Sequence, residues 1–526
     1  MNTSLTTRVS CVFRFLVIQL TAALLFVSLS SAQVIATADL FGNSYAAFEQ
    51  MRSTKGVYLD RLRFDGNKTG IPVSVSNSGM GMVALCIAAQ KGWITDADAK
   101  AKITQTLNTL MNKTSGFRLD RNASGFPRHF VDPVSGANAS SEYSTVDAAL
   151  MVCGAMFAKK KYSTDANIVR LADAMYNSVN WSKAIANAST GTIYLEMDQA
   201  GNGIPGAVVN SWSEYMLVAY FAYRAANGAN NASAQLWNKF YTNPNSADVT
   251  KRVYFTEALL SDGTFLSHFI TQFCYYLNTT FINSPAYGTY LTNAKNADKL
   301  WFSKSGPRAS YEWGLGAGAS NLPGGYHADR IDENSTRIVS PHIIAGFRPV
   351  NSGSITDLTN MSVNVPRSIY TLPGTTRRIL WRYSLTDPNW RAQDLQGVDF
   401  ATMLFGLAAN NLGTSFFKNY NNFNIGTFNF VAAARPALLP TKEENSSRKV
   451  SVYPTVTSDF VYVDGTGIES SNGNIRLGNI AGQLVYSSAI DTKAVQTINV
   501  SELRAGLYFL HVTSDSGNSV SKIIVK

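Results

Sequence analysis

The chain has 526 residues, 45% of them apolar and 15% charged, which is enough for one large domain with a sizeable core and a small second domain. Its formal net charge of +10 is dispersed, without a run of basic residues interleaved with aromatics, and this argues against a nucleic-acid-binding protein. After the first 32 residues no segment is apolar for long enough to span a bilayer, so we expect a mature protein without a transmembrane segment.

Residues 1–32 have the pattern of a secretory signal peptide. Two arginines precede an apolar run at 15–29, and small residues stand just before Gln33. The three cysteines that follow are odd in number and widely spaced, which predicts buried thiols rather than a disulfide framework or a zinc site. The sequence also lacks a calcium-binding loop motif, so we predict no metal and no other cofactor.

From residue 78 onward, strongly apolar helices alternate with amphipathic ones. In the first pair, 78–91 is apolar and its glycines indicate close packing or close approach to a ligand, while 95–112 has one apolar side. This alternation predicts a mainly α fold, a closed α/α barrel whose loops on one face form a cleft. Later helices are expected at 144–160 with 165–178, in the segment opened by 211–214 and continuing to 223 with 232–241, at 267–277 with 284–301, and at 342–347 and 400–412.

The segment 140–155, SSEYSTVDAALMVCGA, places two carboxylates at the start of one of these apolar helices. Ser144 is the expected N-cap, Glu142 precedes it and Asp147 follows three residues later. Both acids then lie near the positive end of the helix dipole. Ser-x-x-Asp is also a capping box, in which Asp147 would only satisfy backbone N–H groups.

A second Ser-x-x-acid pattern, SWSE at 211–214, opens the next apolar helix. It predicts that Glu214 is the third helical residue, flanked by Trp212 and Tyr215. A carboxyl group that is partly buried among apolar groups has a raised pKa, which suits the general acid of glycosidic cleavage. The capping-box interpretation stays open for Glu214 as well.

Glycosidic cleavage also needs a base or a nucleophile opposite the acid. Asp147 and Glu142 are candidates for the base or for positioning a water molecule or a sugar hydroxyl. Asp399, which follows Gly397 closely at the start of the last apolar helix, is a further candidate base. Several helices that begin at one rim, each with an acid or an aromatic, would form the cleft that this chemistry requires.

Other side chains suit sugar binding. Residues 311–329 are too rich in glycine for a helix and contain Trp313, Tyr326 and His327, whose rings can stack on pyranoses. An ordinary connecting loop is the alternative, and the glycines lack the spacing of a phosphate-binding loop. His268 lies on an apolar helix, where a core histidine is equally expected. The remaining candidates are Arg128 and His129, in the loop GFPRHF, and Trp212.

The composition changes at residue 431. Residues 431–449 contain prolines, charges and serines and predict a linker, and 450–526 alternate in short segments that predict a β-sandwich of roughly seven strands. This last segment resembles the C-terminal sorting domain of the type IX secretion system, on VYPT (452–455), GNIAGQLV (478–485), LRAGLY (503–508) and the terminal KIIVK. The resemblance implies export by that machinery, through the periplasm and across the outer membrane, to the cell surface or the medium.

Nine segments within residues 58–420 together carry a second resemblance. They are 76–95, GFPRHFVD (125–132), 140–155, NSWSEYMLVAYFAY (210–223), FLSHFITQ (265–272), 282–301, 313–328, 339–349 and GVDFATMLFGLAANN (397–411). On these segments the chain resembles the bacterial glucoamylase-like family that contains endo-β-1,2-glucanases. The resemblance implies an α/α six-hairpin toroid for residues 33–430. It also implies an inverting glycoside hydrolase acting on a glucan, with β-1,2-glucan as the expected polysaccharide or oligosaccharide substrate.

The chain departs from the family pattern at three positions. The family usually has Asp near Asn321 and Gln in place of Phe400, and it commonly has Glu in place of Ala409. The departures at Phe400 and Ala409 favour an alternative, a non-catalytic glycan-binding surface protein on the same barrel. The hydrolase is favoured by the retention of Glu142, Asp147, Glu214 and Asp399. A polysaccharide lyase is a third interpretation, in which a uronate would meet Arg128, His129 and Tyr326.

Overall fold

The structure is a computed structural model, which describes residues 34–432 and 450–525 except 454–455, 467–472, 480–483, 505 and 515–516. The predicted signal peptide and residues 433–449 of the predicted linker lie outside the described residues. Two hydrophobic cores are present, one built from residues between 35 and 425 and one from residues between 461 and 525.

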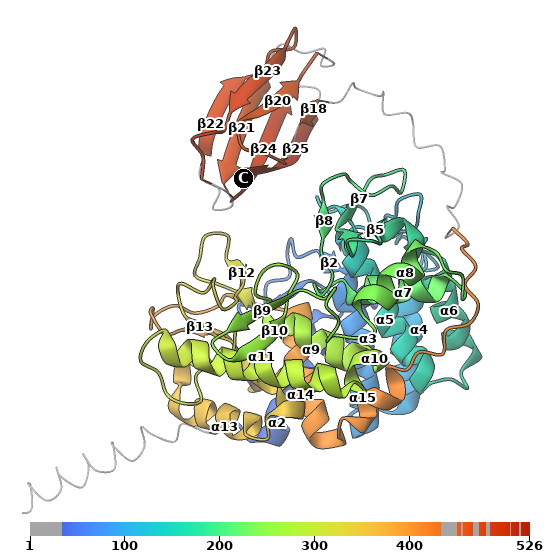
Figure 1. Cartoon of the computed structure of the whole chain (residues 1–526), viewed down its shortest axis with the longest axis vertical. Coiled ribbons are helices and arrows are strands. Elements are labelled where there is room, and N and C mark those ends of the chain that lie inside the picture. Colours follow the sequence, from blue (N-terminus) through green and yellow to red (C-terminus); the bar gives the residue numbers. More distant parts are fainter. Residues whose placement is uncertain are drawn as a thin grey trace, which may run out of the picture.

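The large domain, which ends at residue 432, is mainly helical (Figure 1). Its described residues form fourteen α-helices. They are α2 Thr37–Met51, α3 Val75–Lys91, α4 Asp96–Leu110, α5 Thr145–Lys161, α6 Ala166–Asn177, α7 Met216–Ala225, α8 Ala232–Phe240, α9 His268–Leu277, α10 Thr279–Ile282, α11 Pro285–Lys304, α12 Pro341–Gly346, α13 Ser354–Asn364, α14 Gly397–Leu412 and α15 Ser415–Tyr420.

Buried and amphipathic helices alternate, as the sequence pattern predicts. Helices α3 and α5 are buried on nearly all sides, whereas α4 and α6, which follow them, bury one side. Helix α3 packs against α5 and α14, and α14 packs against α12, so the buried helices form the centre of the domain. The mainly α fold is confirmed. None of the described helices is long and apolar enough to cross a membrane.

Short antiparallel strands lead the chain into the N-terminal ends of three buried helices. Strand β2 (Val73–Ser74) runs into α3, β4 (Tyr143–Ser144) runs into α5, and β17 (Asp394–Gln396) runs into α14. Their partners are β3 (Phe130–Val131), β7 (Glu196–Met197) and β1 (Arg61–Arg63). The other strands of this domain are β5 Ile185–Asn187, β6 Thr192–Tyr194, β8 Val208–Val209, β9 Lys251–Tyr254, β10 Glu257–Leu260, β11 Ala317–Ala319, β12 Tyr326–Ala328, β13 Ile338–Val339, β14 Ile369–Thr371, β15 Arg378–Leu380 and β16 Tyr383–Ser384.

Helices α3 and α5 are in backbone contact at two glycines. A Cβ on Gly79 would lie 2.2 Å from the carbonyl oxygen of Leu150, and a Cβ on Gly154 would lie 2.0 Å from the carbonyl oxygen of Gly79. Real atoms do not approach so closely, so each helix needs glycine at this point. Close helix packing, one of the two predicted roles, therefore explains the glycine in α3.

An irregular segment, 421–431, ends the large domain and is bonded to it. The side chain of Asn227 accepts a hydrogen bond from the Phe428 N–H at 2.8 Å and donates one to the Phe428 carbonyl at 2.9 Å. The carbonyl oxygen of Asn177 accepts from the Val431 N–H at 2.9 Å. The bonded part of the large domain thus extends to Val431, one residue into the predicted linker.

The C-terminal domain consists of two sheets. One has the order β18 (Ser451–Tyr453), β20 (Phe460–Asp464), β23 (Val495–Asn499). The other sheet has the order β19 (Val456–Thr457), β25 (Gly517–Val525), β24 (Gly506–Ser514), β21 (Gly473–Asn479), β22 (Leu484–Ala489). Apolar residues of both sheets, among them Val461 in β20 and Leu510 in β24, form one buried cluster, so the sheets pack face to face as predicted for a sandwich.

Replacing Gly79 by Ala should destabilise the protein. The added methyl group would meet the backbone of α5, which cannot move aside as a side chain can, and overpacking of this kind costs about 1–3 kcal/mol. Gly288→Ala is the matched control, because a Cβ there meets nothing within 4 Å and alanine favours a helix. Denaturant unfolding of both variants measures the difference, and equal stability would contradict the packing argument.

Candidate active site

The N-terminal ends of several buried helices meet at one open cleft. Its volume is about 1150 Å³, including the solvent at its open side. The four predicted carboxylates all line this cleft, although they are up to 257 positions apart in the sequence (Glu142 to Asp399). The lining residues are Asp60, Arg61, Ser74, Ser76, His129, Phe130, Glu142, Ser144, Val146, Asp147, Leu150, Glu214, Tyr215, Phe269, Tyr326, Gln396, Val398 and Asp399.

Asp147 is held at the first turn of α5 by the predicted N-cap. The Ser144 hydroxyl oxygen accepts a hydrogen bond from the Asp147 N–H at 3.2 Å, and the hydroxyl lies 2.5 Å from Asp147 Oδ2 as a donor. The other carboxylate oxygen, Oδ1, faces His129. Asp147 is therefore part of the cap and also presents one oxygen to the cleft.

His129 lies between two of the predicted carboxylates. Its Nδ1 is 3.1 Å from Glu142 Oε1, and its Nε2 is 3.7 Å from Asp147 Oδ1. Burial alone would lower the pKa of His129, but Asp147 and Glu142 outweigh burial and raise this pKa to about 9. The ring is therefore positively charged at neutral pH.

Glu214 lies in a turn before α7, which begins only at Met216. The prediction that Glu214 is the third residue of the helix is wrong, because the chain turns at Trp212, whose φ of +66° is incompatible with a right-handed helix. Burial, together with the nearby Asp147 and Asp399, raises the pKa of Glu214 to about 7. Among the described residues, no side chain forms a hydrogen bond or ion pair with the Glu214 carboxyl group.

Asp399 is buried in the first turn of α14 and also has a raised pKa. Burial is the main cause, and it raises the pKa of Asp399 to about 7 even though the charge of Arg382 opposes it. The Tyr326 hydroxyl donates to Asp399 Oδ1 at 3.4 Å. The Tyr326 ring is 47% exposed and lies at the cleft, so it is accessible to a sugar.

Sequence reasoning missed two residues, Arg382 and Gln396, that support the cleft near Asp399 and Tyr326. Arg382 is fully buried, forms an ion pair with Asp329, and donates to the carbonyl oxygen of His327 at 3.3 Å. Gln396 accepts from the Ala319 N–H at 2.8 Å. Both therefore anchor the β11–β12 hairpin that carries Tyr326. Their partners are more than 50 positions away in the sequence, so no local pattern could have shown these roles.

Asp60 was missed as well. Its carboxylate lines the cleft and is paired with Arg61 at 3.0 Å, and burial raises the pKa of Asp60. It directly precedes a three-residue strand, β1, and the sequence around it has no helical periodicity or motif that would have singled it out.

Two predicted aromatic subsite residues lie in the core instead of the cleft. Trp313 is fully buried, and its Nε1 donates to Asp357 Oδ2 at 2.9 Å. Trp212 is 1% exposed and is stacked on Tyr287. Their placement does not support direct contact with a sugar, because neither ring is accessible.

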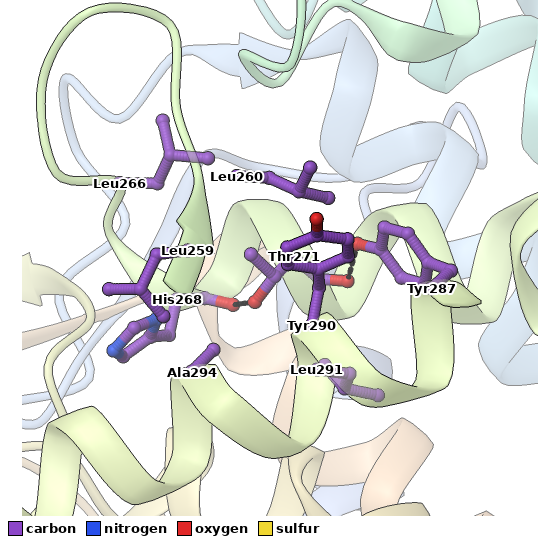
Figure 2. Close-up of a pocket in the computed structure, with 9 residues that line it drawn as sticks. All are labelled: Leu259, Leu260, Leu266, His268, Thr271, Tyr287, Tyr290, Leu291 and Ala294. Atoms are coloured by element: carbon purple, nitrogen blue, oxygen red, sulfur yellow. Dashed lines mark hydrogen bonds between the residues drawn. The ribbon is translucent and has the colours of Figure 1, made fainter. Parts of the chain in front are cut away.

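His268 lies at a separate small pocket between α9, β10 and α11 (Figure 2). The pocket is mostly apolar, and Figure 2 shows Thr271 donating to the His268 carbonyl oxygen, at 2.9 Å. Burial lowers the pKa of His268 to about 3, so the ring is neutral. The core interpretation of this histidine fits its position better than sugar binding does.

The last two predicted sugar-binding residues face away from the cleft. The Arg128 guanidinium lies 3.6 Å from the centre of the Tyr143 ring, and its Nε bonds to Asp120 at 3.0 Å. His327 alternates with Tyr326 on β12 and bonds through Nδ1 to Asp329 at 2.7 Å. Neither side chain lines the cleft, so neither placement supports the predicted role.

The described residues include one compact group with the side-chain types of a metal site. The ligand atoms of His129, Glu142 and Asp147 all lie within 4.8 Å of one another. Because each nitrogen of the charged ring faces a carboxylate, we interpret the group as an ion-pair cluster. The absence of a metal stays a prediction.

Comparisons with known proteins agree with the two-part organisation. Residues 451–526 match the family model of the secretion system C-terminal sorting domain. None of the curated proteins matches the chain in sequence. The helical domain has the fold of solved endo-β-1,2-glucanases.

The similar structures include bacterial and fungal proteins. One is the endo-β-1,2-glucanase of Chitinophaga pinensis, with 16% identity, coverage of 73% of this chain and 95% of that chain, and a TM-score of 0.60. Another is a candidate glucoamylase from Bacteroides fragilis, with 16% identity, coverage of 75% and 96%, and a TM-score of 0.61. The endo-β-1,2-glucanase of Talaromyces funiculosus has 10% identity, coverage of 75% and 93%, and a TM-score of 0.51. These likenesses establish the fold of the helical domain.

Trp313→Phe should lower stability without changing what the cleft binds. The variant loses the bond to Asp357 and leaves space in the core, which together cost about 1–3 kcal/mol. Tyr326→Ala should weaken binding at the cleft and leave stability nearly unchanged, because Tyr326 is exposed there. Thermal unfolding and titration calorimetry with gluco-oligosaccharides measure both effects, and loss of binding in a stable Trp313 variant would restore that residue to the site.

Proposed function

We propose that the protein is an exported glycoside hydrolase that cleaves a β-1,2-linked glucan on an α/α six-hairpin toroid. The observation that carries the proposal is the pair Glu214 and Asp399, two carboxyl groups with raised pKa in one open cleft. The fold shared with endo-β-1,2-glucanases supports the substrate. The sorting-domain match supports export by type IX machinery to the cell surface or the medium.

Glu214 is the general acid in this mechanism. Its raised pKa, about 7, means that the carboxyl group still carries a proton near neutral pH and can donate it to the glycosidic oxygen as the bond breaks. Asp399 is the base. The Tyr326 hydroxyl and the charge of Arg382 both favour the ionised form of Asp399. By contrast, no described side chain stabilises the ionised form of Glu214 by bonding to its carboxyl group.

The remaining cleft residues would bind the glucan. Glu142 and Asp147 present acceptor oxygens to sugar hydroxyls, and Tyr326 offers an exposed ring for stacking. We also propose inversion at the anomeric carbon, which the family resemblance implies. Asp399 would then remove a proton from a water molecule, directly or through a substrate hydroxyl, on the face opposite Glu214.

The sites where the chain departs from the family pattern do not line the cleft. Phe400 is fully buried and packs against Phe48 and Trp381. Ala409 lies ten residues after Asp399 on the same helix, which is about 15 Å along the axis. These placements favour a retained reaction over a purely glycan-binding protein.

The charge of the cleft argues against a polysaccharide lyase. A uronate substrate needs cations around its carboxylate, but the cleft has only Arg61 and His129 as cationic side chains among its described lining residues. Arg61 is paired with Asp60 and Asp394. The carboxylates of the cleft would repel a uronate, whereas a neutral glucan meets no such barrier.

Glu214→Gln should lower kcat on β-1,2-glucan by at least about 100-fold, because glutamine has no proton to donate. Reducing-sugar release measures the rate, and ¹H NMR of the first product gives its anomeric configuration. Glu257→Gln is the control, since this carboxylate lies on β10, bonds to Asn296 and does not line the cleft.

Full activity of the Glu214 variant would contradict the assignment of the acid. If the wild-type protein cleaves no glucan in a panel of linkages but still binds one in calorimetry, the glycan-binding interpretation replaces the hydrolase. An unsaturated product that absorbs ultraviolet light would indicate a lyase instead.

The rate should have a narrow pH optimum near 7. Above this value Glu214 loses its proton, and kcat/KM should fall about tenfold for each further pH unit. Below it Asp399 becomes protonated and the base is lost. Tyr326→Phe removes a bond that lowers the pKa of Asp399, so the acidic limb should move to higher pH. A flat profile between about pH 5 and 9 would refute this division of roles.

A further inference from the structure

The backbone fixes His129 beside the carboxylates of the cleft. Its N–H donates to the carbonyl oxygen of Glu142 at 3.0 Å, and the Val75 N–H donates to the carbonyl oxygen of His129 at 3.4 Å. These bonds tie the loop before β3 to the starts of α5 and α3. The backbone of His129 is therefore held in place at the cleft, and 32% of its side chain is exposed.

Both ring nitrogens face a carboxylate oxygen, Glu142 Oε1 at 3.1 Å and Asp147 Oδ1 at 3.7 Å. Neutral imidazole has one N–H and can donate toward only one of them, whereas imidazolium can donate toward both. Asp147 Oδ2 is already occupied by the Ser144 hydroxyl, so the ring faces the remaining oxygen of that carboxylate.

The other charged groups near His129 are Asp60, Arg61 and Glu214. Arg61 is neutralised by Asp60 at 3.0 Å and Asp394 at 3.2 Å. His129 is thus a cation beside both Glu142 and Asp147, whereas Glu214 has no bonded cation among the described residues.

We propose that His129 is a positioning residue whose imidazolium bridges Glu142 and Asp147, holds both carboxylates oriented toward sugar hydroxyls, and leaves the transferable proton of the cleft on Glu214. The inference rests on the proposed function. The raised pKa of His129, about 9, agrees with a ring that stays charged throughout the working range of the acid.

A direct test is an NMR titration of the full chain labelled with ¹³C at the histidine Cε1. The sequence has five histidines, and His129→Gln identifies the signal. We expect this signal to titrate above pH 8, well above the ordinary histidine value of about 6.5. Glu142→Gln should lower the midpoint by about 1 unit, and the wild-type and Glu142 spectra suffice if the His129 variant does not fold. A midpoint at or below the ordinary value overturns the proposal.

The pH profile of kcat/KM supplies the second test. The imidazolium lowers the pKa of Glu214, so His129→Gln should move the alkaline limb about 1 unit upward, leave the acidic limb in place and raise KM about tenfold. His129→Lys keeps a positive charge and should return the alkaline limb toward the wild-type position. Arg128→Gln removes the adjacent cation, which faces Asp120, and should move neither limb.

The outcomes separate this inference from the proposed function. A high His129 midpoint in a protein that cleaves no glucan would leave the charged bridge standing and refute the hydrolase. Glucan cleavage with an ordinary midpoint, or with an unmoved alkaline limb in His129→Gln, would refute the bridge alone. Loss of activity with a chelator and its return with a divalent cation would also refute the bridge, because a metal ion would then supply the positive charge.

Discussion

The backbone contact between α3 and α5 sets the geometry of the cleft. Because no side chain separates these helices at Gly79 and Gly154, their N-terminal ends are held together, and Asp147 is brought beside the start of α3. A similar contact joins α14 to α12, where a Cβ on Gly406 would lie 1.9 Å from the Ala345 carbonyl oxygen. The positions of Asp147 and Asp399 thus depend on Gly154 and Gly406, which lie about two helical turns further along α5 and α14.

Helix N-termini and burial have opposite effects on the pKa values of the carboxyl groups in the cleft. Helix N-termini favour anions, whereas removal from water disfavours them, so neighbouring acids can differ widely in their protonation. His129 lies beside Glu142 and Asp147, with its ring nitrogens 3.1 Å and 3.7 Å from their carboxylate oxygens. Elsewhere in the cleft, Tyr326 and the buried Arg382 only partly offset the effect of burial on the pKa of Asp399, and Glu214 receives the least compensation. The proposed acid and base roles therefore follow from the groups that surround each carboxyl group.

Sequence reasoning found the acids more reliably than the rings. Helix starts have local signals, so Asp147 and Asp399 could be placed at the first turns of buried helices and expected at one rim. The orientation of a ring in a glycine-rich segment has no such signal, and Trp313 is buried whereas Tyr326 lies in the cleft. Asp60 was missed because its role depends on pairing between distant strands, which no local pattern encodes. The mainly α fold followed from helical periodicity, which is strong in long apolar segments.

The hydrogen-bonded segment 421–431 also determines where the helical domain ends relative to the C-terminal sorting domain. Phe423 and Ile425 lie in the core of the helical domain, and the hydrogen bonds of Asn227 and Asn177 fasten the chain as far as Val431. The helical domain therefore completes its own packing before the sorting sequence begins. Such an arrangement makes the tail modular, since it can be exchanged or trimmed after Val431 without opening the core.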